Sequence, residues 1–123
     1  MKNQLMITGL LLAMAFQMNA QRPDFGPQCK EAMKKLSYLT GDWSGKATIR
    51  NQGGETVIDQ TEHIEWELDG MVLSIEGTGF QNGAVKFHAF ALVNYDPFSQ
   101  QYKFKSYVME GYATDAYFNV LED

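Results

Sequence analysis

Three metal-ligating side chains recur at every second position in the segment His63-x-Glu65-x-Glu67. On a β-strand this spacing places all three on one face, and zinc accepts imidazole and carboxylate ligands. Side chains that follow one another on one strand face are roughly 6.5–7 Å apart, so a metal site would need a further ligand from a neighbouring strand. The alternating positions are apolar, namely Ile64, Trp66 and Leu68. We therefore expect the trio to form a solvated outer face.

Other catalytic signals are sparse. The chain has two histidines, His63 and His88, and contains no G-x-S-x-G, H-E-x-x-H or C-x-x-C motif and no phosphate-binding loop. Ser44 lies in GDWSG, which begins a predicted strand, and no base is predicted within its reach. We expect His88 to be an exposed polar residue, the alternative being a haem ligand at the mouth of a cavity. No metal and no other cofactor are expected, and a hydrolase or isomerase that uses His63 or His88 as a base stays an alternative.

Aromatic residues concentrate in the last third of the chain, from Tyr95 to Phe118. Inside a small β-barrel such side chains either fill the core or line a pocket for an apolar ligand. Strand parity puts the predicted ligand-binding residues on the apolar side of their segments, and these residues are Trp66, Met71, Phe87 and Phe104. The predicted partner is a small apolar molecule.

The elements that must position these residues are strands. Six segments with strand character are separated by turn signals, at roughly residues 43–50, 55–68, 71–80, 84–95, 101–109 and 116–121. Asp69-Gly70 and Asn82-Gly83 fit two-residue type I′ hairpins, and Pro97 fits the second position of a type I turn. Short connectors make successive strands antiparallel neighbours, which predicts an up-and-down meander. Its one-sided apolar face must be hidden, by curling or by packing on another sheet.

The N-terminal part has a different organisation. Residues 1–20 combine Lys2, an apolar run over residues 7–16 and the small-ended sequence Met18-Asn19-Ala20, a layout typical of a secretory signal peptide. Residues 21–27 are expected to form a linker, and residues 28–39 a short helix that begins the domain spanning residues 28–123. We therefore predict a secreted or periplasmic protein that has no membrane segment after removal of the signal.

Charge and cysteine content narrow the class of protein. Removing residues 1–20 leaves 103 residues (123 − 20) and changes the formal net charge from −5 to −6, because Lys2 is lost. An acidic chain is a poor nucleic-acid binder, although basic and aromatic residues alternate over residues 101–107. The one cysteine, Cys29, is expected to be a free thiol, so core packing must supply the stability.

Three features in order resemble the calycin superfamily of lipocalin-like barrels, and specifically a secreted branch of unknown function. They are Gly41-x-Trp43 at the start of the first strand, Trp66-x-x-x-Gly70 after the second, and Tyr95-Asp96 before an aromatic strand. The resemblance covers about residues 36–121. It implies an antiparallel barrel with an N-terminal helix, in which Trp43 closes one end; an indole can bury on the order of 200 Å².

The resemblance also implies eight or more strands, whereas six are predicted here. We expect that the sequence is truncated after Asp123, or else that another chain pairs with the open edge and gives an oligomer. Truncation would remove the position of the histidine that holds haem in nitrobindin-like members. The predicted fold is thus an all-β, up-and-down lipocalin-like barrel, complete or incomplete, with a short N-terminal helix.

Three functions follow as hypotheses. The first is an exported, non-enzymatic protein that binds a small apolar ligand. The second is an enzyme that uses the barrel lumen, and the third is an interaction module completed by strand pairing at its edge.

Overall fold

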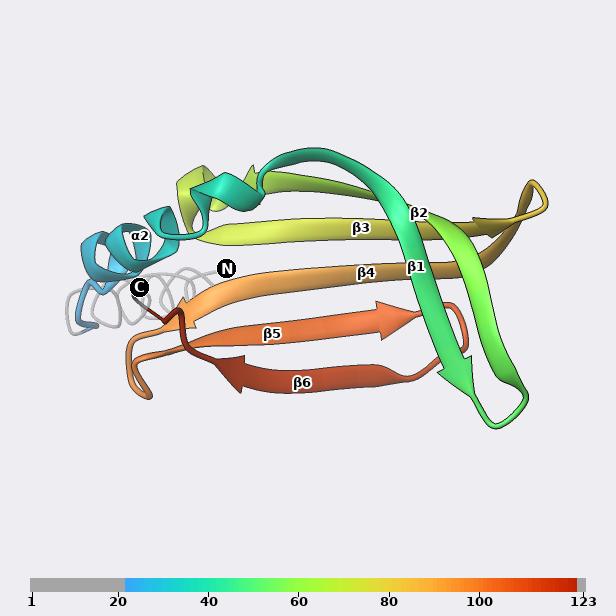
Figure 1. Ribbon diagram of the computed structural model, residues 1–123. Coiled ribbons are helices and arrows are strands. Elements are labelled where there is room, and N and C mark those ends of the chain that lie inside the picture. Colours follow the sequence, from blue (N-terminus) through green and yellow to red (C-terminus); the bar gives the residue numbers. More distant parts are fainter. Residues whose placement is uncertain (1–21, 122–123) are drawn as a thin grey trace, which may run out of the picture.

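A computed structural model describes residues 22–121 of the chain (Figure 1). The signal peptide predicted over residues 1–20 lies outside the described residues. Within these residues, one short helix and two single-turn 3₁₀ helices accompany six strands. In chain order these are α2 (Gly26–Lys34), η1 (Ser37–Leu39), β1 (Gly41–Asn51), β2 (Gly54–Glu67), η2 (Leu68–Gly70), β3 (Val72–Gln81), β4 (Ala84–Asp96), β5 (Gln101–Val108) and β6 (Ala113–Phe118).

All six strands form one antiparallel sheet in sequence order, which confirms the predicted meander. The sheet is not closed into a barrel, because β1 and β6 are not hydrogen-bonded neighbours. The β1–β2 hairpin nevertheless turns steeply and crosses the direction of the other strands, so the sheet is strongly curled (Figure 1). The structure therefore corresponds to the incomplete form of the predicted barrel.

Two turns show how local sequence sets the connections. Asn82 and Gly83 have φ angles of 52° and 77°, as both central positions of a type I′ turn require. The Asp69-Gly70 connection is longer than predicted. Leu68 also adopts a positive φ, 49°, and the chain makes one 3₁₀ turn before Met71.

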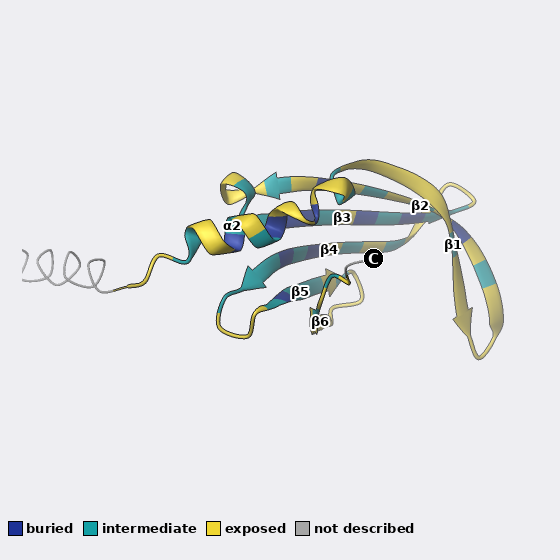
Figure 2. Ribbon diagram, turned by 60° about the vertical axis from the view of Figure 1, so that its left-hand side comes forward, coloured by how far each residue is buried: buried dark blue, intermediate teal, exposed yellow. Residues whose placement is uncertain are grey.

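The core lies at one end of the sheet, under α2. The helix buries Met33, and Leu36 follows it into the same cluster. On the sheet, the cluster includes Leu73 and Val93, whose Cα atoms are paired across β3 and β4. We call the sheet face that carries this cluster the inner face. Figure 2 shows that burial is concentrated here, while β1 is exposed along most of its length.

Trp43 does not have the role predicted for it. Its side chain lies on the inner face opposite Glu62, but it stays 50% exposed. The indole Nε1–H donates a hydrogen bond to the Leu39 carbonyl oxygen at 2.7 Å, which ties β1 to η1. Because the sheet is open, there is no barrel end for the indole to close. Trp43 therefore anchors the chain where the helical segment enters the sheet.

Two further expectations concern Cys29 and the membrane. Cys29 is a free, buried thiol, as predicted. Over residues 22–121, no helix combines the length and the apolar character needed to cross a membrane.

Candidate functional site

Inward-facing side chains of the central strands change in size along the sheet. At the α2 end they are large, with Leu73 on β3 and Tyr102 on β5 packed in the core. Toward the other end they are small: Gly77 is paired with Ala89, and Ala91 is paired with Ser106. Small residues at adjacent inner positions leave space that a well-packed protein interior normally fills. The sequence therefore builds a filled core at one end and a hollow beside it.

This hollow has a volume of about 300 Å³ and lies on the inner face across β2 to β5. Most of its lining is apolar, with aromatic rings from Phe87 and Phe104. Its full lining is Gln60, Glu62, Ile75, Gly77, Phe87, Ala89, Ala91, Phe104, Ser106 and Val108.

Two glycines on β3 let polar side chains of β2 lie over the sheet. A Cβ atom at Gly77 would lie 3.1 Å from Gln60 Nε2 and 3.8 Å from Glu62 Oε1. A Cβ atom at Gly79 would lie 3.0 Å from Gln60 Oε1. The Gln60 amide and the Glu62 carboxylate thus occupy space that ordinary side chains on β3 would take. They give the otherwise apolar hollow one polar wall.

The four predicted ligand-binding residues do not share one cavity. Phe87 and Phe104 line the hollow on the inner face. Trp66 points into a second cavity, and Met71 lies in the turn after η2, where its backbone N–H is bonded to the carbonyl oxygens of Glu67 and Leu68. Alternation alone places Met71 on the same face as Leu73. The 3₁₀ turn precedes Met71, however, and β3 begins only at Val72, so Met71 lies outside the strand.

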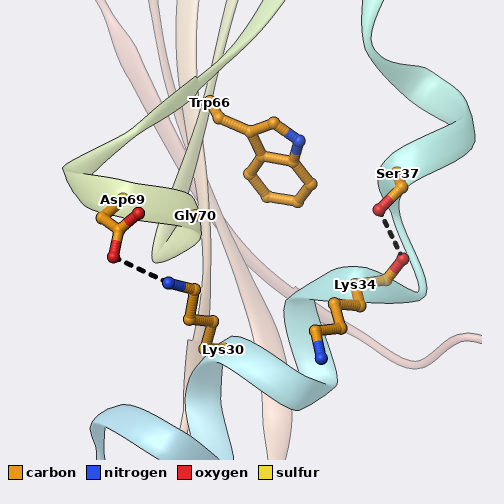
Figure 3. Close-up of a pocket in the computed structure, with 6 residues that line it drawn as sticks. All are labelled: Lys30, Lys34, Ser37, Trp66, Asp69 and Gly70. Atoms are coloured by element: carbon orange, nitrogen blue, oxygen red, sulfur yellow. Dashed lines mark hydrogen bonds and ion pairs between the residues drawn. The ribbon is translucent and has the colours of Figure 1, made fainter.

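The second cavity is about 340 Å³ and lies where α2 approaches η2 (Figure 3). Trp66 forms one wall, and its partly buried indole also packs against the core. An ion pair of 2.7 Å joins Lys30 Nζ on α2 to Asp69 Oδ2 on η2. This ion pair links the helix to the turn at the edge of the cavity.

Both histidines lie on the outer face, each against a carboxylate. His63 Nδ1 is 2.7 Å from Asp42 Oδ1 across β1 and β2, and His88 Nε2 is 3.1 Å from Glu76 Oε1 across β3 and β4. The hydrogen bond and charge of Asp42 raise the pKa of His63 above its ordinary value. In the part of the chain that the structure describes, no three histidine, cysteine, aspartate or glutamate side chains are placed so that they could hold a metal ion. His63, Glu65 and Glu67 are all exposed on this face of β2.

Sequence reasoning missed Gln60 and Glu62 as inner residues of the hollow. Both fall on the parity of Ile64 and Trp66, which the alternation pattern of the segment identifies as the apolar side. Polar residues that interrupt an apolar parity, opposite glycines on the next strand, were the available signal. The pairing of Glu62 with Gly77 shows why the interruption is tolerated.

Comparison with known proteins gives no relative. No protein-family model matches the chain, and neither a curated protein nor a solved structure matches it. The calycin resemblance therefore stays a prediction based on its three motifs, and function must be argued from the site.

Proposed function

We propose that this protein is a non-enzymatic binding protein that holds a small apolar molecule in the hollow on its inner face. The single observation that carries the proposal is the hollow itself, which is built by small residues next to a densely packed core. Ligand sites are mostly apolar concavities of ~300–1,000 Å³ with a few polar groups. The hollow has this composition and lies at the lower end of this range, which suits a small guest.

Enzymatic use of the hollow is less well supported. A general base must come within hydrogen-bond reach of its substrate. His63 and His88, the only histidines of the chain, both lie on the outer face. The hollow itself offers Glu62 and Ser106, and no hydrogen bond between them is present among the described residues.

The same lining bears on haem. Haem iron in proteins is held by histidine, cysteine, methionine or tyrosine. None of these residue types lines the hollow within residues 22–121. The residues present do not fit haem, and the proposed ligand is an apolar organic molecule.

The site of action proposed here is outside the cytoplasm. This part of the proposal rests on the layout of residues 1–20, with Lys2, the apolar run and the small-ended sequence before Gln21.

Calorimetric titration of the full chain with n-octanol, an uncharged apolar probe, tests the binding function. The informative variant is Ala89→Leu, which adds an isobutyl group to the wall of the hollow. We expect it to weaken octanol binding by about tenfold or more, because the added group occupies space that the ligand would fill. A tenfold change corresponds to about 1.4 kcal/mol of binding free energy. Ala113→Leu makes the same chemical change at an exposed outer position of β6 and should leave binding intact. Absence of octanol binding, or equal effects of the two variants, would overturn the proposal.

A further inference from the structure

Glu62 is the one charged residue that lines the hollow. It is half-buried, and its carboxylate reaches over Gly77 toward the apolar floor. Within the described ranges, no ion pair or hydrogen bond engages this carboxylate. Removing a carboxylate from water without a partner is costly, so partly buried charges are normally paired. The hollow therefore presents a negative group that lacks a counter-ion.

Within the described strands, no regularly paired basic residue shares the inner face with this carboxylate. The basic residues that are paired in the strand register all fall on the opposite parity, and they are Lys46, Arg50, Lys103 and Lys105, while the exposed Lys86 lies at the β-bulge of β4. Lys46 and Arg50, on the strand next to Glu62, are each paired with an outer-face carboxylate. Among the regularly paired residues, the inner face of the sheet thus carries one negative charge and no positive charge.

An aromatic ring stands beside Glu62. Trp43 is its direct partner in the β1–β2 register, and directly opposed residues have Cβ atoms ≈ 4.5–5.5 Å apart. The hydrogen bond from Nε1 to Leu39 fixes the indole, and half of the side chain stays open to solvent. A fixed, accessible tryptophan next to a carboxylate attracts cations through both the ring face and the charge.

We propose that the ligand is an apolar molecule that carries a protonated amine. Its ammonium group binds the Glu62 carboxylate beside Trp43, and its apolar part lies on Ala89, Phe104 and the other small and aromatic residues of the hollow. This inference rests on the proposed binding function and adds the charge of the ligand to it.

Three probes with the same octyl group but different head groups separate the contribution of charge to binding from that of apolar contact. We would titrate the full chain with n-octylammonium, n-octanol and n-octanoate at neutral pH and moderate salt. We expect n-octylammonium to bind about tenfold more tightly than n-octanol, which is the gain from one charge-assisted hydrogen bond, and n-octanoate to bind most weakly.

Two variants with the same charge change locate the effect. Glu62→Gln should remove the preference for n-octylammonium while n-octanol still binds. Glu65→Gln alters a carboxylate on the outer face of the same strand and should keep the preference, so it controls for net charge. Circular dichroism checks that both variants are folded.

The outcomes distinguish the two proposals. Failure of all three probes to bind would overturn the binding function and this inference together. Binding of n-octanol with no preference for n-octylammonium, or a preference that survives Glu62→Gln, would overturn only the assignment of an amine ligand.

Discussion

At the scale of single residues, the Asp42–His63 pair gives the outer face a titration that can be measured. The hydrogen bond to Asp42 comes first among the causes that raise the pKa of His63, followed by the charge of Asp42 and a smaller contribution from Glu65. A pKa that is higher in the folded than in the unfolded chain stabilises the fold below the unfolded value. This contribution is lost as the pH rises through the folded value.

We therefore expect Asp42→Asn to lower the pKa of His63, as measured by NMR titration of the imidazole proton signals. Asp115→Asn removes a carboxylate from the outer face of β6, where it pairs with Lys105, and should leave the His63 titration in place. An unchanged His63 pKa in Asp42→Asn would mean that the 2.7 Å contact is not formed in solution. The stability effect should be small, because the pair is largely exposed.

At the scale of elements, α2 is held to the sheet by buried apolar contacts and by a hydrogen bond of 2.7 Å from the Tyr102 hydroxyl to the Ala32 carbonyl oxygen. Met33 is fully buried, whereas the neighbouring Lys34 is exposed and pairs only with Glu31 of the same helix. We expect Met33→Ala to lower the free energy of unfolding by about 2–5 kcal/mol, because it leaves a cavity in the core. Lys34→Ala should change it by less than about 0.5 kcal/mol. Urea unfolding of both variants measures this, and a small loss in Met33→Ala would show that α2 is not docked.

Elements whose signals are local were predictable from the sequence. The turn at Asn82-Gly83 and the alternation from Phe87 to Tyr95 define their strands from a few residues each. The last strand was placed too late, at residues 116–121, because the apolar end Phe118–Leu121 attracts a strand assignment. The strand begins at Ala113, shortly after the turn at Gly111, because pairing with β5 overrides the weak strand propensity of Ala113 and Asp115.

Features that depend on how distant strands meet were not predictable. Whether the sheet closes is decided by its curvature and register over all six strands, and no single segment encodes it. Trp43 was predicted to close one end of a barrel, and this prediction was wrong because the sheet does not close into a barrel. The hollow was half predicted: Phe87 and Phe104 follow from parity, but Gln60 and Glu62 need the pairing of β2 with the glycines of β3.

At the scale of the whole molecule, the two ends of the sheet differ in how many buried apolar side chains stabilise them. Beyond the hollow, toward the turn that joins β1 to β2, the hairpin has one buried side chain, Ile58. Its other residues there are exposed or half-exposed (Figure 2). The α2 end contains Met33, Leu73 and Val93 in one cluster. Segments with few buried apolar contacts open with free energies well below that of global unfolding.

Native-state hydrogen exchange should therefore show different amide protection at the two ends of the sheet. We expect the hydrogen-bonded amides of β1 to exchange through local opening, and those around Leu73 and Val93 only through global unfolding. Ile58→Ala should speed exchange in the β1–β2 hairpin more than near Leu73, whereas Met33→Ala should lower the protection near Leu73 and Val93 and leave the local opening of β1 almost unchanged. Equal loss of protection in both regions of Ile58→Ala would contradict this division. Because Glu62 lies on β2 and Phe104 on β5, opening of the hairpin would release a bound ligand, as global unfolding does, and n-octylammonium should therefore slow exchange in β1–β2 as well as near Leu73.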